Sequence, residues 1–458
     1  MALDSCDALS FIQSLAPSWH KGQQVILSEV IKALQERPVL CPTEIARSLP
    51  PGPNAKEPCS LHSRLKRLDR FLSNGRLDEG AIFVRCFYLT CQFGSDPPGS
   101  TDEVPILPLL LDTTYFEPFA AVMASVPCGS RGLPIALTTY HRYNLEACFP
   151  HSSARSFLSQ NLIEEKFIEY VWSLITPTVR TVLVADRGFA RGSLMRWLLD
   201  RGRDFVIRFD SDTHLSLPDG TSGAVKEVLA IKPGQSHWIA KGWYGKDDHV
   251  PISALAIWEE GQEEPWYLAT SLKDPNTVEK LYRWRGRIEC GYRDEKTGVI
   301  LREGGDDHKL RSVLHLHRLL LAILSLHWLA AISGLQAHHD LPESDAPNAS
   351  EPTTRLEEAS PNTDSLELLR QGPAQPPPAI PHRGPTPKLP PWMKRFAVRG
   401  PLSYVRLGME ILRAKAEDLT RLVRRAIRWV GIYLWIWPPR WRPWQIRYRL
   451  NHWWPLPS

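Results

Sequence analysis

Two short runs of apolar residues, each followed directly by an aspartate, constrain the fold of this chain more than any other feature. Residues Ile106–Asp112 read ILPLLLD, and residues Thr181–Asp186 read TVLVAD. Continuous apolar runs of this length are typical of strands buried on both faces of a parallel sheet. Because functional groups gather at the carboxyl ends of adjacent parallel strands, the pattern predicts Asp112 and Asp186 at one edge of an α/β sheet.

The residues around these runs complete the pattern of an α/β fold. Further strands are predicted at Ala121–Val126, Leu133–Tyr140 and Asp204–Phe209. Helices are predicted at Ser153–Ile175 and Ser193–Asp200. The resulting order is three strands, helix, strand, helix, strand. Parallel pairing requires helical crossovers, so we expect helices on the faces of the sheet.

The first hundred residues read mostly as helix. Apolar residues recur at helical spacing in Gln23–Gln35 and Leu61–Asn74, with a short helical segment, Glu44–Leu49, between them. The surface of the last helix is basic, with Arg64, Lys66, Arg67 and Arg70. This arrangement fits a small DNA-binding module, and it fits equally an ordinary helical domain with a solvated face.

Composition divides the remainder of the chain. Residues 210–272 hold short β-like runs between Gly and Asp, and residues 341–390 contain twelve prolines, typical of a linker. The predicted segments are a helical N-terminal DNA-binding domain (1–100), the first part of the catalytic core (101–209), a β insertion (210–272), a catalytic helix with a packing helix (273–335), a Pro-rich linker (336–390) and a basic Trp/Arg-rich tail (391–458).

The tail is strongly basic, whereas the rest of the chain is slightly acidic. It holds fourteen Lys or Arg against three Asp or Glu, so that its net charge is +11 and that of the remainder is −6. Interleaved arginines and aromatic rings favour contact with DNA or another partner, which we rank first. A membrane interface and a non-native reading-frame extension are the alternatives.

No uncharged apolar run reaches the ~18–20 residues of a membrane span. The most apolar stretch, Leu319–Ile332, contains His327 and predicts a buried core helix. The N-terminus lacks the pattern of a secretory signal, and none of the eight cysteines forms a C-x2-C pair. We therefore expect a cytoplasmic protein without a membrane span.

A helix predicted at Asn276–Gly298, with Asn276 as its N-cap, carries four functional side chains on one face. At about 100° per residue, they project within a sector of ~60°. These residues are Tyr282, Arg285, Glu289 and Lys296. Taken alone, the stripe is equally a solvated face with an i,i+4 ion pair.

The two strand-end aspartates change that interpretation. Glu289 on a helix above the same edge would bring a third carboxylate to Asp112 and Asp186, and like charges this close need a cation. Carboxylate oxygens suit Mg²⁺, and three carboxylates suit two ions ~3.5–4 Å apart, the arrangement used in phosphoryl transfer. The phenol and the two cations on the helix would then bind flanking phosphates.

These motifs together resemble the DDE transposases of the insertion-sequence-four family. The resemblance rests on the two aspartates, on the signature Y-x2-R-x3-E-x6-K, and on the stretches Pro42–Pro50, Ser63–Asn74 and Ser130–Tyr140. It covers about residues 20–335 and excludes the linker and the tail. It implies a ribonuclease H-like core with a β insertion between the second Asp and the Glu.

The resemblance also implies an activity and its residues. The enzyme would be a Mg²⁺-dependent polynucleotidyl transferase, in which Mn²⁺ can replace Mg²⁺, acting as an endonuclease and strand transferase on double-stranded DNA at transposon ends and target. A homodimer in the synaptic complex is implied as well. Asp112 would bridge both metals, Asp186 and Glu289 would each complete one site, and Arg285, Lys296 and Tyr282 would contact phosphates.

A tryptophan of the insertion stacks on a flipped base in several family members. The candidates here are Trp238, Trp243, Trp258 and Trp266. The alternative is that most of them pack within the insertion. Five histidines are interpreted as structural or solvent-exposed rather than as metal ligands: His141, His151, His315, His317 and His327.

Two further functions share these residues. One is a non-mobile nuclease or recombinase on the same core, and the other is a catalytically inactive DNA-binding derivative. The intact acids and phosphate-binding residues count against the second. Inverted terminal repeats flanking the gene would distinguish a mobile element from a non-mobile nuclease.

Overall fold

The computed structural model of this chain describes residues 5–36, 39–52, 59–93, 106–128, 131–145, 159–175, 180–296, 310, 312–339 and 409. They belong to one of two compact units, formed by residues 1–340 and 403–458. The predicted tail is represented only by Met409, and the predicted linker only by residues 336–339. Those four residues end a helix that begins at Val313.

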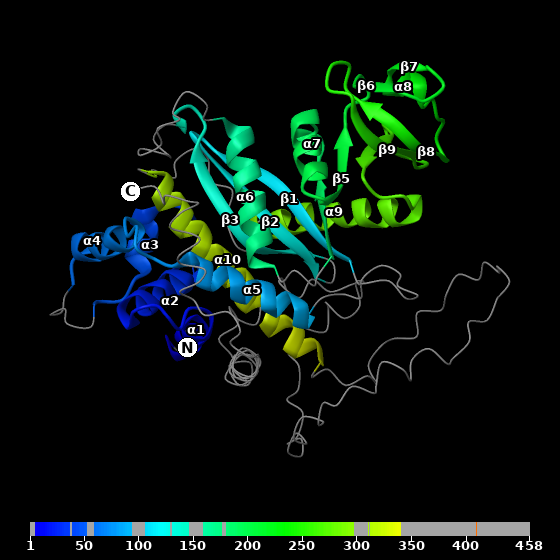
Figure 1. Ribbon diagram of the computed structural model, residues 1–458. Helices are drawn as coiled ribbons and strands as arrows, with labels where there is room; N and C mark the ends of the chain where they lie inside the picture. The colour runs from blue at the N-terminus through cyan, green and yellow to red at the C-terminus, as the bar shows by residue number, and fades with distance from the viewer. Residues whose placement is uncertain are drawn as a thin grey trace. The chain divides into compact units, whose positions relative to one another are not determined.

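Helices and strands follow one another in the order shown in Figure 1. The helices are α1 (Ser5–Leu15), α2 (Lys21–Glu36), α3 (Pro42–Ser48), α4 (Leu61–Leu72), α5 (Glu79–Phe93), α6 (Gln160–Leu174), α7 (Gly192–Asp200), α8 (Val225–Val228), α9 (Pro275–Lys296) and α10 (Val313–His339), with a 3₁₀ turn η3 (Arg187–Phe189). The strands are β1 (Ile106–Phe116), β2 (Phe119–Cys128), β3 (Arg131–His141), β4 (Arg180–Ala185), β5 (Asp204–Phe209), β6 (His214–Ser216), β7 (Ser222–Ala224), β8 (Gln235–Tyr244), β9 (Val250–Trp258) and β10 (Trp266–Thr270).

The fold is a mixed α/β structure built on one large mixed sheet. Its strand order is β3-β2-β1-β4-β5-β10-β9-β8-β6-β7. β4 pairs in parallel with β1 and β5, whereas β2 and β3 are antiparallel neighbours of β1. The five strands predicted between residues 106 and 209 are confirmed, as is the order of strands and helices in this region.

Local sequence explains where these helices begin. The helix predicted from Ser153 begins at Gln160, after Ser159, whose hydroxyl accepts a hydrogen bond from the Leu162 N–H and caps the helix. Ser60 caps α4 in the same way through the N–H of Ser63. Residues 153–158 lie outside the described part of the chain.

The strands predicted as a β insertion continue the core sheet. β10 pairs antiparallel with β5, β9 pairs with β10, and β8 with β9. The insertion therefore adds its strands to the free edge of β5 by backbone hydrogen bonds. Because of this, its tryptophans keep fixed positions relative to the two aspartates.

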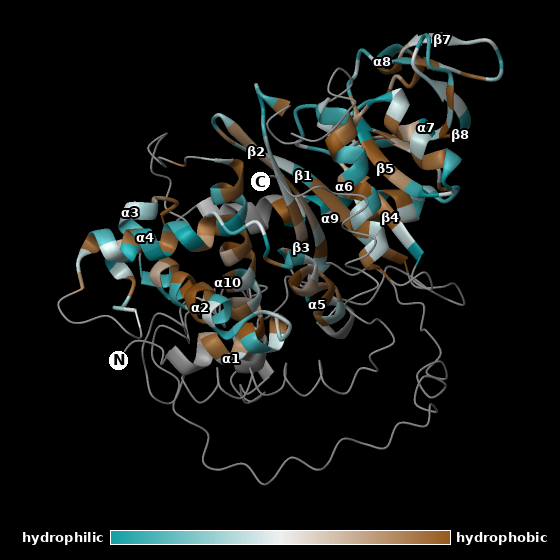
Figure 2. Cartoon of the chain, turned by 60° about the vertical axis from the view of Figure 1, so that its left-hand side comes forward, coloured by the Kyte–Doolittle hydropathy of each residue, from teal (hydrophilic) through white to brown (hydrophobic). Residues whose placement is uncertain are grey.

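Helix α10 forms the centre of the helical side of the structure. It packs against β2, β3, α2 and α4, and Figure 2 shows hydrophobic residues distributed over it. The stretch Val313–Gly334 has the length and composition of a membrane span, but all of its most apolar window is buried inside the protein. The buried core helix expected around Leu319–Ile332 is confirmed.

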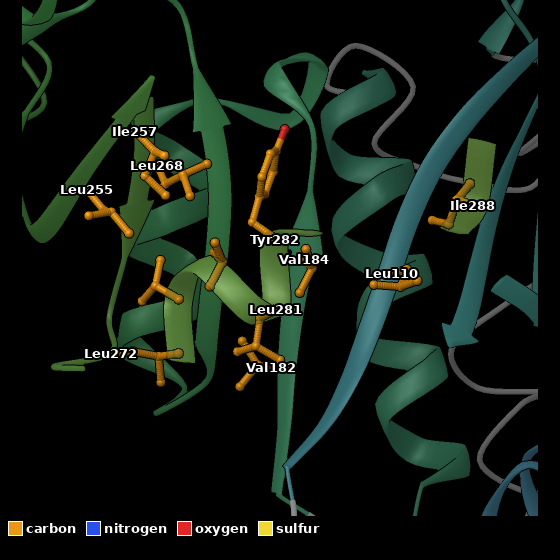
Figure 3. Packing of buried hydrophobic residues seen from close by; sticks show 12 residues of the cluster. Leu110, Val182, Val184, Leu255, Ile257, Leu268, Leu272, Leu281, Tyr282 and Ile288 are labelled. Carbon is orange, nitrogen blue, oxygen red and sulfur yellow. The ribbon is translucent and has the colours of Figure 1, made fainter. Parts of the chain in front are cut away.

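A cluster of buried apolar side chains fixes α9 on the sheet. Leu110, Val184 and Val206 contribute from the strands β1, β4 and β5. The helix contributes Val278 and Leu281, among others. Figure 3 shows the cluster between the strands and the helix. Burial of this surface determines which side of the sheet α9 covers.

Candidate active site

The pairing register places Asp112 and Asp186 at the same level on adjacent strands. β1 and β4 are parallel, and Leu110 lies opposite Val184. Continuing each chain by two residues brings Asp112 level with Asp186. Paired strands lie ~4.8 Å apart, so both aspartates follow, two residues on, from neighbouring positions at the same edge of the sheet. This juxtaposition at the edge of β4 is the one expected from the two apolar runs.

The sequence pattern suggested that Asp112 ends its strand, but the strand continues beyond it. β1 continues to Phe116 and pairs with β2 over these last residues. β4, by contrast, ends at Ala185. Asp112 is therefore held on one side by its antiparallel pairing with β2. On its other side, the neighbouring strand β4 has already ended.

Both aspartates lie on the face of the sheet that α9 covers. Leu110 and Val184 belong to the apolar cluster packed under this helix (Figure 3). Alternate residues of a strand point to the same face, so Asp112 and Asp186, two residues further on, share that face. The sheet and the helix therefore enclose the two carboxylates from the same side.

Asp274 caps α9, contrary to the expectation for Asn276. Its carboxylate accepts hydrogen bonds from the backbone N–H groups of Asn276 and Thr277, at 3.3 and 2.9 Å. Pro275 then occupies the first helical position, where its missing N–H is no loss. Aspartate is an effective N-cap, and the helix dipole favours its negative charge.

Arg285 forms an ion pair with Asp186. Its Nη2 lies 3.1 Å from Asp186 Oδ2, and the two side chains are 16% and 28% exposed. The other oxygen, Oδ1, accepts a hydrogen bond of 2.9 Å from the N–H of Gly188. The structure thus brings together a predicted metal ligand and a predicted phosphate-binding cation.

Tyr282 is buried rather than solvent-exposed. It is 3% exposed, and its ring meets Trp266 edge to face at a centroid distance of 5.1 Å. Its hydroxyl points away from Val184 and Leu281 in Figure 3. Burial raises the pKa of Tyr282 to about 12, although Arg285 and Arg208 oppose the shift. The phenol stays protonated at neutral pH and can donate a hydrogen bond.

Arg208 is a site residue that the sequence reasoning missed. Val184 of β4 lies opposite Val206 of β5, so Arg208 lies level with Asp186. Its guanidinium lies close enough to the Tyr282 hydroxyl to oppose the rise of that pKa, and it forms an ion pair with Glu264. A charged residue inside the apolar strand DFVIRF was the available signal, but its position beside Asp186 follows only from strand pairing.

Glu289 and Lys296 lie on α9, and their side chains are outside the described part of the structure. Ile288, next to Glu289, packs closely on β3, where a Cβ added at Gly132 would lie 3.2 Å from its Cα. Gly132 pairs with Pro127, whereas Met123 pairs with Asp112. Ile288 thus contacts the sheet at a position that is four residues along β2 from the partner of Asp112.

Two of the three predicted acids are therefore brought together by the described residues. Within the described residues, no group of three or more His, Cys, Asp or Glu side chains could hold a metal ion. Two adjacent carboxylates are suitable donors for a hard divalent cation, and a third ligand has to come from Glu289 or from another residue.

The four candidate tryptophans differ in their distance from the site. β10 is antiparallel to β5, so Trp266, its first residue, lies at the sheet edge that holds Asp186. Trp258 lies near it, at the end of β9. Trp238 is paired with Leu255 in the middle of β9, and Trp243 with Pro251 at the opposite end. Trp266 is thus the candidate nearest to the aspartates.

Two of the four cations on the basic helix α4 serve its packing. Arg67 donates a hydrogen bond of 2.6 Å to the carbonyl of Pro50 and forms an ion pair with Glu29 at 2.9 Å. Arg64 donates to the carbonyl of Arg47 at 3.2 Å. Lys66 and Arg70 are exposed.

The histidines have the packing roles expected for them, where they are described. On α10, His315 is buried and bonds to Ser73 at 2.9 Å, and His317 is partly buried and pairs with Glu79. His327 is fully buried in the same helix. His141 packs edge to face on Phe119. His151 and the arginines of the tail lie outside the described residues.

Comparison with known proteins agrees with the candidate site. Residues 165–329, which include Asp186 and the whole Y-R-E-K stripe, match the family model described as "Transposase DDE domain". This range supports a DDE transposase, and Asp112 lies before it. No curated protein matches the chain.

One solved structure similar to this chain is the cryo-EM structure of the piggyBac transposase synaptic complex with hairpin DNA. The similarity covers 95% of this chain and 77% of that chain, with 9% identity and a TM-score of 0.38. A score this low carries no argument about the present chain.

Proposed function

We propose that this protein is a DDE transposase of the insertion-sequence-four type. It would hydrolyse a phosphodiester bond at each transposon end and join the freed 3′-hydroxyl to target DNA. The observation that carries the proposal is the parallel pairing of Leu110 with Val184, from which Asp112 and Asp186 each follow by two residues, in a chain whose residues 165–329 match a transposase DDE domain.

The sheet topology supports a ribonuclease H-like core. Strands β3-β2-β1 form an antiparallel meander, and β4 and β5 add to β1 in parallel. This is the arrangement that the family resemblance implies. β6 to β10 would then be the insertion between Asp186 and Glu289, attached to the edge of the core sheet.

The site residues would have the following roles. Two Mg²⁺ ions, when bound, supply charge neutralisation at the attacking and leaving oxygens. Asp112, Asp186 and Glu289 would hold them. Arg285, which is paired with Asp186, would bind a phosphate of the substrate. Tyr282 would donate to a phosphate oxygen, with Arg208 orienting its hydroxyl.

Double-stranded DNA is the proposed partner, and a homodimer would hold two transposon ends in the synaptic complex. A cytoplasmic, nucleoid-associated location follows from these substrates. The runner-up functions, a non-mobile nuclease or recombinase and an inactive DNA-binding derivative, use the same fold. The intact pair of aspartates favours an active enzyme over the inactive derivative.

Cleavage of a candidate end tests the proposal. The full chain is incubated with a labelled duplex that carries the sequence flanking its gene, in Mg²⁺, in Mn²⁺ and in EDTA. We expect a nick at the end in either metal and no nick in EDTA. A protein that binds this duplex but never cuts it would be the inactive derivative, and cutting without joining to a target would favour the nuclease.

Lys296 provides a second prediction. Lys296→Ala is expected to weaken the complex with the cleaved end several-fold, because one phosphate contact is lost. The slope of log affinity against log salt concentration should also become shallower by about one. Lys226→Ala, on the distant helix α8, is the control. An unchanged salt slope for Lys296→Ala would contradict the phosphate contact.

Trp266 provides a third prediction. If its ring stacks on a flipped base, Trp266→Ala should abolish the fluorescence increase of a 2-aminopurine placed at the transposon end, and Trp266→Phe should retain much of it. Trp243→Ala, at the opposite end of the sheet, is the matched control. Loss of the signal in Trp243→Ala rather than in Trp266→Ala would contradict the assignment.

A further inference from the structure

A cluster of aromatic and basic side chains lies at the sheet edge beyond Asp112. The described residues include three exposed large apolar side chains, and two of them are here: Tyr115, 52% exposed, and Tyr143, 72% exposed. The guanidinium of Arg142 lies over both rings, 4.4 Å from the centroid of Tyr115 and 5.5 Å from that of Tyr143. Exposure this large leaves both rings accessible to a ligand.

Local contacts hold the cluster in place. The backbone N–H of Arg142 donates a hydrogen bond of 3.0 Å to the carbonyl of Pro118 in the β1–β2 turn. The Arg142 side chain forms an ion pair with Glu117 of the same turn. His141 meets the ring of Tyr143 edge to face at 6.3 Å. These contacts hold the two rings near the ends of paired strands. Because the rings are already ordered, less entropy is lost on binding.

The cluster lies near the candidate active site. Tyr115 follows Asp112 by three residues, which is about 10 Å along the strand. Because alternate residues face opposite sides, Tyr115 points to the other face of β1. If one phosphate of a DNA strand is bound at Asp112, the strand would therefore have to pass the edge of the sheet before its bases reach the two rings.

We propose that Tyr115, Arg142 and Tyr143 form a binding site for unpaired nucleotides of the DNA substrate, which stack on the two tyrosine rings. This inference rests on the proposed function. Aromatic faces and a guanidinium plane accept any base, so the site requires no particular sequence. Glu117 offsets the charge of Arg142, so binding should come from stacking more than from phosphate contacts.

Binding of fluorescent dT20 and of a 20-base-pair duplex to the full chain tests the site. The double variant Tyr115→Ala/Tyr143→Ala is expected to lose ~10-fold or more in affinity for dT20, since two stacking faces are removed. Its affinity for the duplex should change less than about twofold. The matched double variant Tyr115→Phe/Tyr143→Phe keeps both rings and should bind dT20 like the wild type.

Three further results test the inference. Glu117→Gln should strengthen dT20 binding, because it removes a negative charge beside Arg142. If the wild type cleaves its end while the alanine double variant binds dT20 as tightly as the wild type, the cluster is not a nucleotide site and the proposed function stands. If the alanine variant loses only an oligomeric state, measured by light scattering, the cluster is a protein contact and the inference is wrong.

Discussion

Asp112→Ala and Asp186→Ala are each expected to reduce cleavage of a transposon end by ~1,000-fold or more. A metal that neutralises charge on the reacting oxygens is worth several kcal/mol, and each 1.36 kcal/mol corresponds to a factor of ten in rate. Removing one of two carboxylates that lie level on adjacent strands leaves too few ligands for the ions. Single-turnover cleavage of a labelled duplex in Mg²⁺ measures the effect.

Binding of the uncut end separates this result from a folding defect. Both variants should bind it within about twofold of the wild type, because positioning contacts to phosphates supply most of the affinity. Asp212→Ala is the control, since that carboxylate is 78% exposed and pairs with Lys226. Efficient nicking by Asp112→Ala would remove the central premise of the site.

Glu79→Gln is expected to destabilise the protein by ~3–5 kcal/mol, the cost of breaking a buried ion pair. Glu79 begins α5 and forms ion pairs with Arg318 and His317 of α10. Arg318 is fully buried, and its second Nη group donates a hydrogen bond to the carbonyl of Asn74 at 2.9 Å. Without the carboxylate, the buried guanidinium of Arg318 and the ring of His317 lose their shared partner.

Equilibrium unfolding in urea measures this effect, with Glu263→Gln at an exposed loop position as control. His317 also bonds to Thr139 of β3 at 3.1 Å, so this network links α5, α10 and the sheet. The loss should therefore affect the global transition rather than the fraying of one helix. An unchanged midpoint for Glu79→Gln would show that the network contributes little to stability.

The pH dependence of the wild type gives an independent check on Glu79. Burial alone would raise its pKa, but His317 and Arg318 outweigh burial and lower it from 4.5 to about 2. A carboxylate whose pKa is lowered by folding stabilises the folded state at pH values above the pKa that it has in the unfolded chain. This stabilisation, about 3 kcal/mol, is lost as the pH falls from 4.5 towards 2. Glu79→Gln should lack this part of the acid sensitivity.

The sequence determined the strands and the acids that follow them. Short, continuous apolar runs favour strands that are buried on both faces, so ILPLLLD and TVLVAD predicted inner strands with aspartates near one edge. Helical periodicity likewise fixed the single face shared by Tyr282 and Arg285. These features depend on local spacing alone, and spacing is fully contained in the sequence.

Tertiary structure decided what those side chains meet. Strand pairing set Asp112 level with Asp186 and brought Arg208 beside them. Packing of α9 buried Tyr282 and gave Arg285 an acidic partner. Register and helix packing depend on contacts between residues far apart in the chain. Local spacing carries no information about such contacts, so the neighbours of each side chain were fixed only when the sheet formed.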